Sequence, residues 1–215
     1  MAVRPPPTTT LRLGSCVLTV FSTVKGLESE RPLVREAIAS ARPEAVALPV
    51  SAEGLRGLRA LHGGREPEFF LSHYEEIYAL KLSRYGRVSV PPPSFSEAYA
   101  ASVERSIPVR AIDLSEEEYA SAFCESVSTL GLIYHSLRWR WLRRRRFRAE
   151  TPEEFVLAWD RAVNSLRGFR SLEDRREEHM ALRLRSLARK YRSILAVLEL
   201  ERTEGVVRRL REGGS

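Results

Sequence analysis

The stretch that decides the fold is CVLTVFST at residues 16–23, followed by ERPLVREAIASAR at 30–42 and EAVALPV at 44–50. The first and last of these segments are short, apolar and bounded by turn residues, which is typical of buried strands. Between them, apolar residues recur at helical spacing from Leu33 to Ala41. Strand, helix and strand in this order predict a right-handed βαβ unit and therefore an α/β fold.

The rest of the chain adds helices and two more strands to this unit. Helices are expected at 51–61, 68–83, 94–104, 116–147, from Thr151, at 172–191 and after Gly205, and strands at 108–114 and 193–198. Ser94 and Glu97 have the spacing of a capping box. We expect one α/β domain at 11–211, a small mixed sheet of about four to six strands flanked by helices, with a helical insertion at 116–170. The termini at 1–10 and 212–215 are expected to be disordered.

The expected helix at 116–147 carries one apolar stripe. Its members keep the spacing of a packed helix face: Val127, Leu130, Ile133, Tyr134, Leu137 and Trp141. The spacing predicts that this stripe packs against the core.

The composition bounds the function classes only loosely. The chain has 215 residues and a formal net charge of +7, and almost all of its positive charge is arginine. Ion-pair networks in a heat-adapted protein, or a GC-rich genome, would account for such an Arg/Glu-rich composition. The sequence contains no signal-peptide pattern and no apolar run of membrane-spanning length, so we expect a cytoplasmic protein.

The common motifs of catalysis and metal binding are missing from the sequence. Cys16 and Cys124 are isolated, and the four histidines (His62, His73, His135 and His179) show no HxxxH or HExxH spacing. There is no P-loop, no GxGxxG and no GxSxG elbow. We therefore predict no catalytic residues, no metal site and no cofactor.

Two segments together resemble the TraB/PrgY family. They are VREAIASARPEAVALPV at 34–50 and SLEDRREEHMALRLRSLARKYRSILAVLELERTEGVV at 171–207. The resemblance covers roughly residues 16–210 and implies a polar pocket at the carboxyl ends of the strands, where α/β folds place their ligands. On this resemblance, the pocket positions would be Lys25, Glu97, Asp113, Arg176, Glu177 and Arg202.

The chain departs from the family pattern at the residues that a metal would need. Lys25 and Arg202 stand where the family has histidines, and Pro49 stands where it has a strand glutamate. Arg175 replaces the leading glutamate of the family's ERD helix, whereas Arg176 and an acid at Glu177 are kept. Because arginine does not lose its proton to become a ligand, the resemblance implies a degenerate member whose metallohydrolase site is lost.

Two fates remain open for the cationic side chains of this pocket. Lys25, Arg176 and Arg202 could hold an anion, or they could pair internally with Asp113, Glu177 or Glu199, which we favour. A separate hypothesis concerns the whole protein: it keeps the family's hydrolase or protease activity, with a metal site rebuilt from Glu97, Asp113 and His179.

The most distinctive local feature is RWRWLRRRRFR at 138–148, which has seven arginines and no acid. Aromatic rings interleaved with guanidinium groups suit base stacking and phosphate contacts. The predicted partner-binding residues are Arg138, Trp139, Arg140, Trp141, Arg143, Arg144, Arg145, Arg146 and Arg148. We refer to residues 138–148 as the arginine segment.

Several roles are open for the arginine segment. It could form an exposed helix with ion pairs to Glu150, Glu153, Glu154 and residues 116–118, or contact RNA, ribosomal RNA included. It would also suit a membrane interface or an acidic protein groove. A second copy of the chain is a further possible partner. The sequence thus favours a non-catalytic, TraB-like binding or assembly module with an anionic partner.

Overall fold

The computed structural model describes residues 8–65 and 71–213. In these residues one sheet contains five strands in the order β1-β2-β5-β3-β4. Their bounds are Thr8–Leu13 (β1), Cys16–Thr23 (β2), Ala45–Leu48 (β3), Val109–Ala111 (β4) and Ser193–Glu199 (β5). β1 is antiparallel to β2, and the other neighbouring strands are parallel. The predicted α/β class, with a small mixed sheet flanked by helices, is confirmed.

The central strands β3 and β5 are almost entirely buried because both faces of the sheet are covered there. Alternate residues of β5 point to opposite sides: Ile194, Ala196 and Leu198 enter one core cluster, and Leu195 and Val197 enter another. All five are buried. This two-sided burial explains why the sequence of these two strands shows apolar runs and no polar alternation, whereas β1 at the sheet edge is polar and partly exposed.

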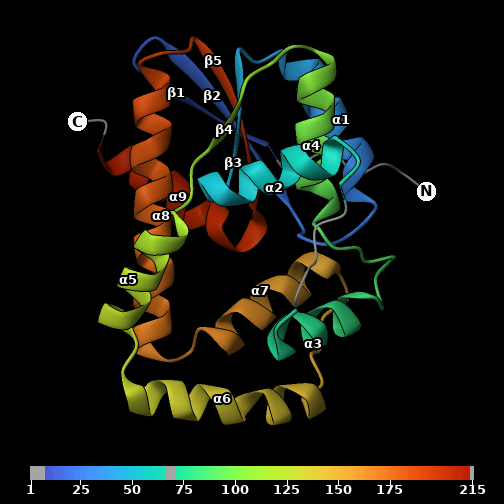
Figure 1. Ribbon diagram of the computed structural model, residues 1–215, viewed down its shortest axis with the longest axis vertical. Coiled ribbons are helices and arrows are strands. Elements are labelled where there is room, and N and C mark those ends of the chain that lie inside the picture. The colour runs from blue at the N-terminus through green and yellow to red at the C-terminus, as the bar shows by residue number, and fades with distance from the viewer. Residues whose placement is uncertain (1–7, 66–70, 214–215) are drawn as a thin grey trace.

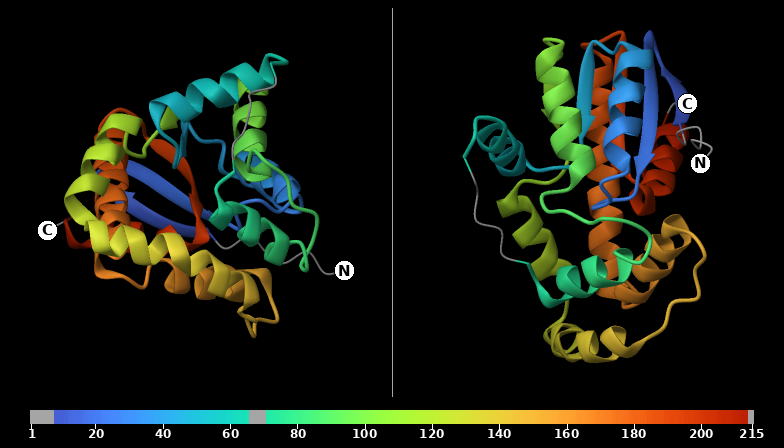
Figure 2. Two further views of the ribbon diagram at one scale, coloured as in Figure 1. Left: turned by 60° about the horizontal axis from the view of Figure 1, so that its bottom comes forward. Right: turned by 90° about the vertical axis from the view of Figure 1, so that its right-hand side faces the viewer.

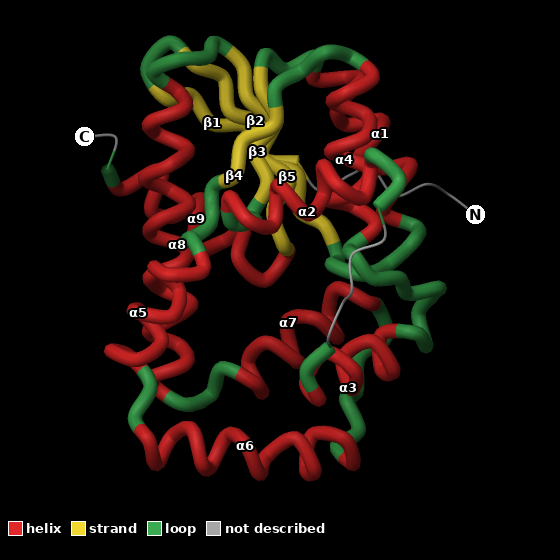
Figure 3. Tube along the Cα trace, viewed as in Figure 1, coloured by secondary structure: helices red, strands yellow, loops and turns green. Residues whose placement is uncertain are grey.

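Helices cover each face of the sheet and extend beyond one end of it (Figures 1 and 3). The described helices are Glu30–Ala41 (α1), Ala52–His62 (α2), His73–Leu82 (α3), Pro93–Glu104 (α4), Glu116–Ser126 (α5), Thr129–Arg144 (α6), Pro152–Val163 (α7), Arg167–Ala188 (α8) and Leu200–Glu212 (α9). α1, α2 and α4 pack on one face, and α8 and α9 on the other. A third apolar cluster joins α3, α6 and α7 outside the sheet. Of these helices, α6 and α7 belong to the expected helical insertion.

Both expected terminal boundaries need correction. β1 begins at Thr8, so Thr8–Thr10 form strand instead of the disordered leader expected at 1–10. These residues pair with β2, which supplies the hydrogen bonds that a free leader would lack. At the other end, α9 includes Glu212, inside the expected tail. Residues 1–7, 214 and 215 lie outside the described residues, as does the start of the helix expected at 68–83.

The single helix expected at 116–147 is wrong, because the chain breaks between α5 and α6. Val127 is extended, and the Ser128 hydroxyl accepts a hydrogen bond from the Gly131 amide at 3.2 Å, which starts a new helix. α8 crosses the end of α5 so closely that a Cβ on Gly168 would lie 2.4 Å from the Ser126 carbonyl oxygen. The helix that carries the first part of the arginine segment thus begins at a Ser cap, which the apolar periodicity did not reveal.

The capping box expected at Ser94 and Glu97 is also wrong. α4 begins one residue earlier, with Pro93 in its first turn, and the Ser94 side chain is buried inside the helix. The carboxylate of Glu97 reaches α1, where Arg35 donates to it from Nε at 2.5 Å. An interhelical ion pair has taken the place of a local cap.

None of the helices in the described part of the chain is long and apolar enough to cross a membrane.

Candidate functional site

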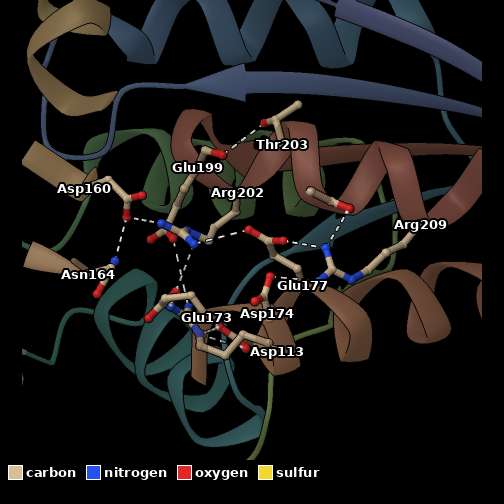
Figure 4. A network of polar contacts seen from close by, with 12 residues as sticks. Asp113, Asp160, Asn164, Glu173, Asp174, Glu177, Glu199, Arg202, Thr203 and Arg209 are labelled. Atoms are coloured by element: carbon tan, nitrogen blue, oxygen red, sulfur yellow. Dashed lines mark hydrogen bonds and ion pairs between the residues drawn. The ribbon is translucent and has the colours of Figure 1, made fainter. Parts of the chain in front are cut away.

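The four parallel strands end at one edge of the sheet, and charged side chains gather there (Figure 4). Glu199 is the last residue of β5, Lys25 lies just beyond β2, and Asp113 follows β4. α8 contributes Arg176 and α9 contributes Arg202 to the same region. Parallel topology therefore brings together five of the residues that form the polar cluster, from separate parts of the sequence.

The cationic groups of the predicted pocket are paired internally. Lys25 Nζ lies 3.0 Å from Glu199 Oε1. Arg176 makes charge-assisted hydrogen bonds with Asp113, the shortest at 2.5 Å, and another with Glu173 at 2.8 Å. These contacts match the internal pairing favoured from the sequence.

Arg202 completes the pairing on the side nearer α7. It is almost fully buried, and its guanidinium donates to Glu177 at 3.2 Å and to Asp160. Arg209 contacts the other oxygen of Glu177 at 2.6 Å, so that two arginines share this one carboxylate (Figure 4). We call these linked residues the ion-pair network: Lys25, Asp113, Asp160, Glu173, Asp174, Arg176, Glu177, Glu199, Arg202 and Arg209.

Burial and charge shift the acids at this edge in opposite directions. Burial alone would raise the pKa of Glu199, but Lys25 and Arg176 lower it to about 2. Burial and the neighbouring Glu199 charge raise the pKa of Glu201 to about 8. One oxygen of Glu201 is buried without a hydrogen-bond partner among the described residues. Glu199 in the network is thus firmly ionised, whereas the neighbouring Glu201, outside the network, stays largely protonated at neutral pH.

Glu97 does not join the other pocket residues, contrary to the expectation from the family pattern. It is held by Arg35, and Arg31 lies within 3.8 Å of it. Within the described residues, it lines none of the cavities around Lys25. The rebuilt metal site of Glu97, Asp113 and His179 is therefore not gathered, because Glu97 faces α1 and Asp113 faces Arg176.

Sequence reasoning missed Asp160, Glu173, Asp174, Glu201 and Arg209. All five lie on helices, and their spacing carries no motif. Only the packing of α7, α8 and α9 brings them to the strand ends.

Two cavities flank the Lys25–Glu199 pair. One, of about 280 Å³, has an apolar wall that includes Tyr78, Val90 and Phe95. The other, of about 270 Å³, opens toward Glu201 and Arg202. Both cavities are lined by Lys25, Glu75, Tyr78, Arg176 and Glu199. Of these, Lys25 and Glu199 pair with each other, and Arg176 pairs with Asp113. No group of three or more His, Cys, Asp and Glu side chains in the described chain is placed to hold a metal ion.

No protein-family profile matches the sequence, and no curated protein matches it. The TraB/PrgY resemblance therefore stays a prediction from the quoted motifs.

The arginine segment differs from the ion-pair network in the exposure of its charged side chains. It forms the second half of α6 and the irregular stretch that follows Arg144. Its backbone is anchored to α3: Lys81 Nζ donates to the carbonyls of Arg143 at 3.1 Å and Arg145 at 2.9 Å. Leu142 is fully buried beneath it. The backbone is thereby fixed while most of the guanidinium groups face solvent.

No salt bridge joins any of the seven arginines to a carboxylate among residues 8–65 and 71–213. Arg140, Arg143, Arg144, Arg146 and Arg148 are exposed, and Arg138 and Arg145 are half-buried. Two of the acids proposed as partners act as helix caps: Glu154 accepts from the Glu150 amide, and Glu118 from the Ser115 amide. For these two acids, cap contacts take the place of the ion pairs considered from the sequence.

The aromatic residues of the segment divide into two groups. Trp139 and Phe147 are half-buried and pack on the cluster formed by α3 and α7. Trp141 is exposed, with the guanidinium groups of Arg138 and Arg145 at 5.5 and 4.9 Å from its ring. One aromatic ring of the segment therefore faces outward among the arginines.

Proposed function

We propose that the protein is a non-catalytic binding or assembly module that contacts an anionic partner through the arginine segment. The observation that carries the proposal is a dense group of guanidinium groups without salt bridges to carboxylates of the described residues, on a backbone held in place by α3. Preformed cationic surfaces attract anionic partners over a Debye length and lose little entropy when they bind. RNA and an acidic protein are the partner classes that the sequence favours.

The contrast with the strand ends supports placing function at the segment. At the strand ends, Lys25, Arg176 and Arg202 already have carboxylate partners. An anion entering there would have to displace internal ion pairs, whereas one reaching Arg143, Arg144 or Arg146 meets no salt bridge from the described residues and releases water and counterions.

A metal-dependent hydrolase with a rearranged site is the alternative, and no contact favours it. Its proposed acids Glu97 and Asp113 are each held by a different arginine. Stoichiometric zinc, manganese or iron in the purified protein would support this alternative instead.

The experiment is retention on immobilised heparin and on single-stranded RNA under a salt gradient. The triple change R143Q/R144Q/R146Q is compared with R183Q/R189Q/R211Q, which removes three exposed arginines from α8, the residue that follows it, and α9. We expect the first variant to elute at much lower salt and the second to stay close to the unchanged protein. Equal shifts for both variants would contradict the proposal, because net charge alone would then explain retention.

A further inference from the structure

The outward face of α6 is apolar, although it was expected to pack against the core. Its members are between 51% and 79% exposed: Leu130, Ile133, Tyr134, Leu137 and Trp141. At about 100° per residue, these five side chains fall within an arc of roughly 100° on the helix. We call them the outer stripe.

α6 is attached to the protein by its opposite face. His135 stacks between Tyr74 and Phe169, with ring centroids 4.2 and 4.0 Å away. Leu142 is buried, and Arg138 donates a hydrogen bond to the Ser165 hydroxyl. The outer stripe is thus turned away from the protein by a defined docking on the other side.

The position of α6 leaves the outer stripe open to a large, flat partner. α6 lies across the end of the molecule remote from the sheet, as Figure 1 and the right-hand view of Figure 2 show. No described element covers the stripe, since its residues remain more than half exposed. A large exposed apolar face of this kind marks an interaction site.

The charges around the stripe suit an anionic surface with an apolar interior. On the helical projection, Arg140 flanks one border of the stripe and Arg138 flanks the other, whereas Arg144 falls within the arc at the carboxyl end of the helix. The sequence has no acidic residue from 127 to 149. Tyr134 and Trp141 are ring systems of the kind that lie at the level of lipid headgroups.

We infer that α6 binds in the plane of an acidic lipid bilayer, with the outer stripe in the acyl boundary and the arginines at the lipid phosphates. An amphipathic helix with a basic polar face and a Trp/Leu apolar face is the usual form of such a site. RNA contacts would use the arginines but leave Leu130 and Leu137 in water. This inference rests on the proposed function and names the class of its anionic partner.

The test is flotation of the full-length protein with vesicles of phosphatidylcholine alone, or of phosphatidylcholine and phosphatidylglycerol in equal parts. We expect binding to the acidic vesicles, a blue shift of tryptophan emission, and little binding to the neutral ones. The change L130S/L137S removes apolar surface without altering charge and should weaken binding by at least about tenfold. L182S is the matched control, because Leu182 on α8 is 57% exposed and lies outside the stripe.

Each other outcome counts against a stated claim. Unchanged vesicle binding by L130S/L137S would overturn the inference. Binding to RNA without binding to acidic vesicles would overturn it as well, yet would leave the proposed function intact. Binding to no anionic partner would overturn both. A dimer in sedimentation equilibrium that dissociates on L130S/L137S would show that a second copy covers the stripe, which also overturns the inference.

Discussion

The ion-pair network and the arginine segment use the same side chain in opposite ways. Arg176 and Arg202 each contact two or more carboxylates and are largely withdrawn from water. The arginines of the segment have no salt bridge within the described chain, and most are exposed. A buried charge must be neutralised by its surroundings, whereas an exposed charge is stabilised by water and remains available to a partner. The network therefore indicates a structural role, and the segment indicates a binding role.

The largest expected effect compares one arginine from each region. Arg202→Met leaves Glu177 and Asp160 with fewer cationic partners and should lower the free energy of unfolding by about 3–5 kcal/mol. Arg146→Met changes only an exposed side chain and should stay within about 0.5 kcal/mol of the unchanged protein. Urea unfolding followed by circular dichroism measures both. Similar losses for the two variants would remove the distinction between the regions.

The packing around the network gives the next largest effect. A Cβ on Gly205 would lie 1.8 Å from Glu177 Oε2, so Gly205→Ala must displace the carboxylate that two arginines share. We expect a loss of about 1–3 kcal/mol in thermal or urea unfolding. Gly57→Ala in α2 is the control, because a Cβ there meets nothing within 4 Å and should stabilise by up to about 1 kcal/mol. A neutral Gly205→Ala would show that the network is loosely packed.

The raised pKa of Glu201 predicts how the stability of the region around the ion-pair network depends on pH. Its pKa is about 8 in the folded protein, above the ordinary value of 4.5, so the folded state binds more protons than the unfolded state between these pH values. The contribution of Glu201 to stability must therefore fall as pH rises through this window. Glu201→Gln should be more stable than the unchanged protein at pH 8, and the difference should shrink toward pH 5. Melting temperatures that run parallel for the two proteins would contradict the raised pKa.

The smallest expected effect concerns the docking of α6. Burial, with a contribution from Arg138, lowers the pKa of His135 from 6.5 to about 4. The unfolded state then binds more protons between these values, so this contribution to stability is lost as pH falls from 6.5 toward 4. His135→Phe keeps the ring between Tyr74 and Phe169 and should reduce the loss of stability at acid pH. Unchanged acid sensitivity in this variant would place the sensitive group elsewhere.

The sequence predicted the sheet better than it predicted α6. Residues 16–23 and 193–198 are recognisable as strands because burial on both faces demands continuous apolar runs. The periodicity of Leu130, Ile133 and Leu137 correctly indicates a helix face, but periodicity alone does not say whether protein or another partner covers it. The break at Ser128 was missed because the apolar spacing continues across it.

At the candidate site, the sequence predicted the internal pairs of Lys25, Arg176 and Arg202. It could not predict that Glu97 pairs with Arg35 instead, since this depends on how α1 and α4 pack. The additional network residues Asp160 and Glu173 come from helices whose positions only the tertiary structure defines. The sequence thus indicated that these cations are paired internally, whereas the full set of their carboxylate partners required the fold.

The most direct test of the account is arginine modification with phenylglyoxal, followed residue by residue with mass spectrometry. Arg143, Arg144 and Arg146 should react quickly in the free protein, whereas Arg202 should be protected by burial and its carboxylate partners. Adding the anionic partner that binds, whether acidic vesicles or RNA, should slow modification of the segment and leave Arg202 unchanged. Slow modification of Arg143, Arg144 and Arg146 in the free protein, or no protection when the partner is bound, would contradict the account.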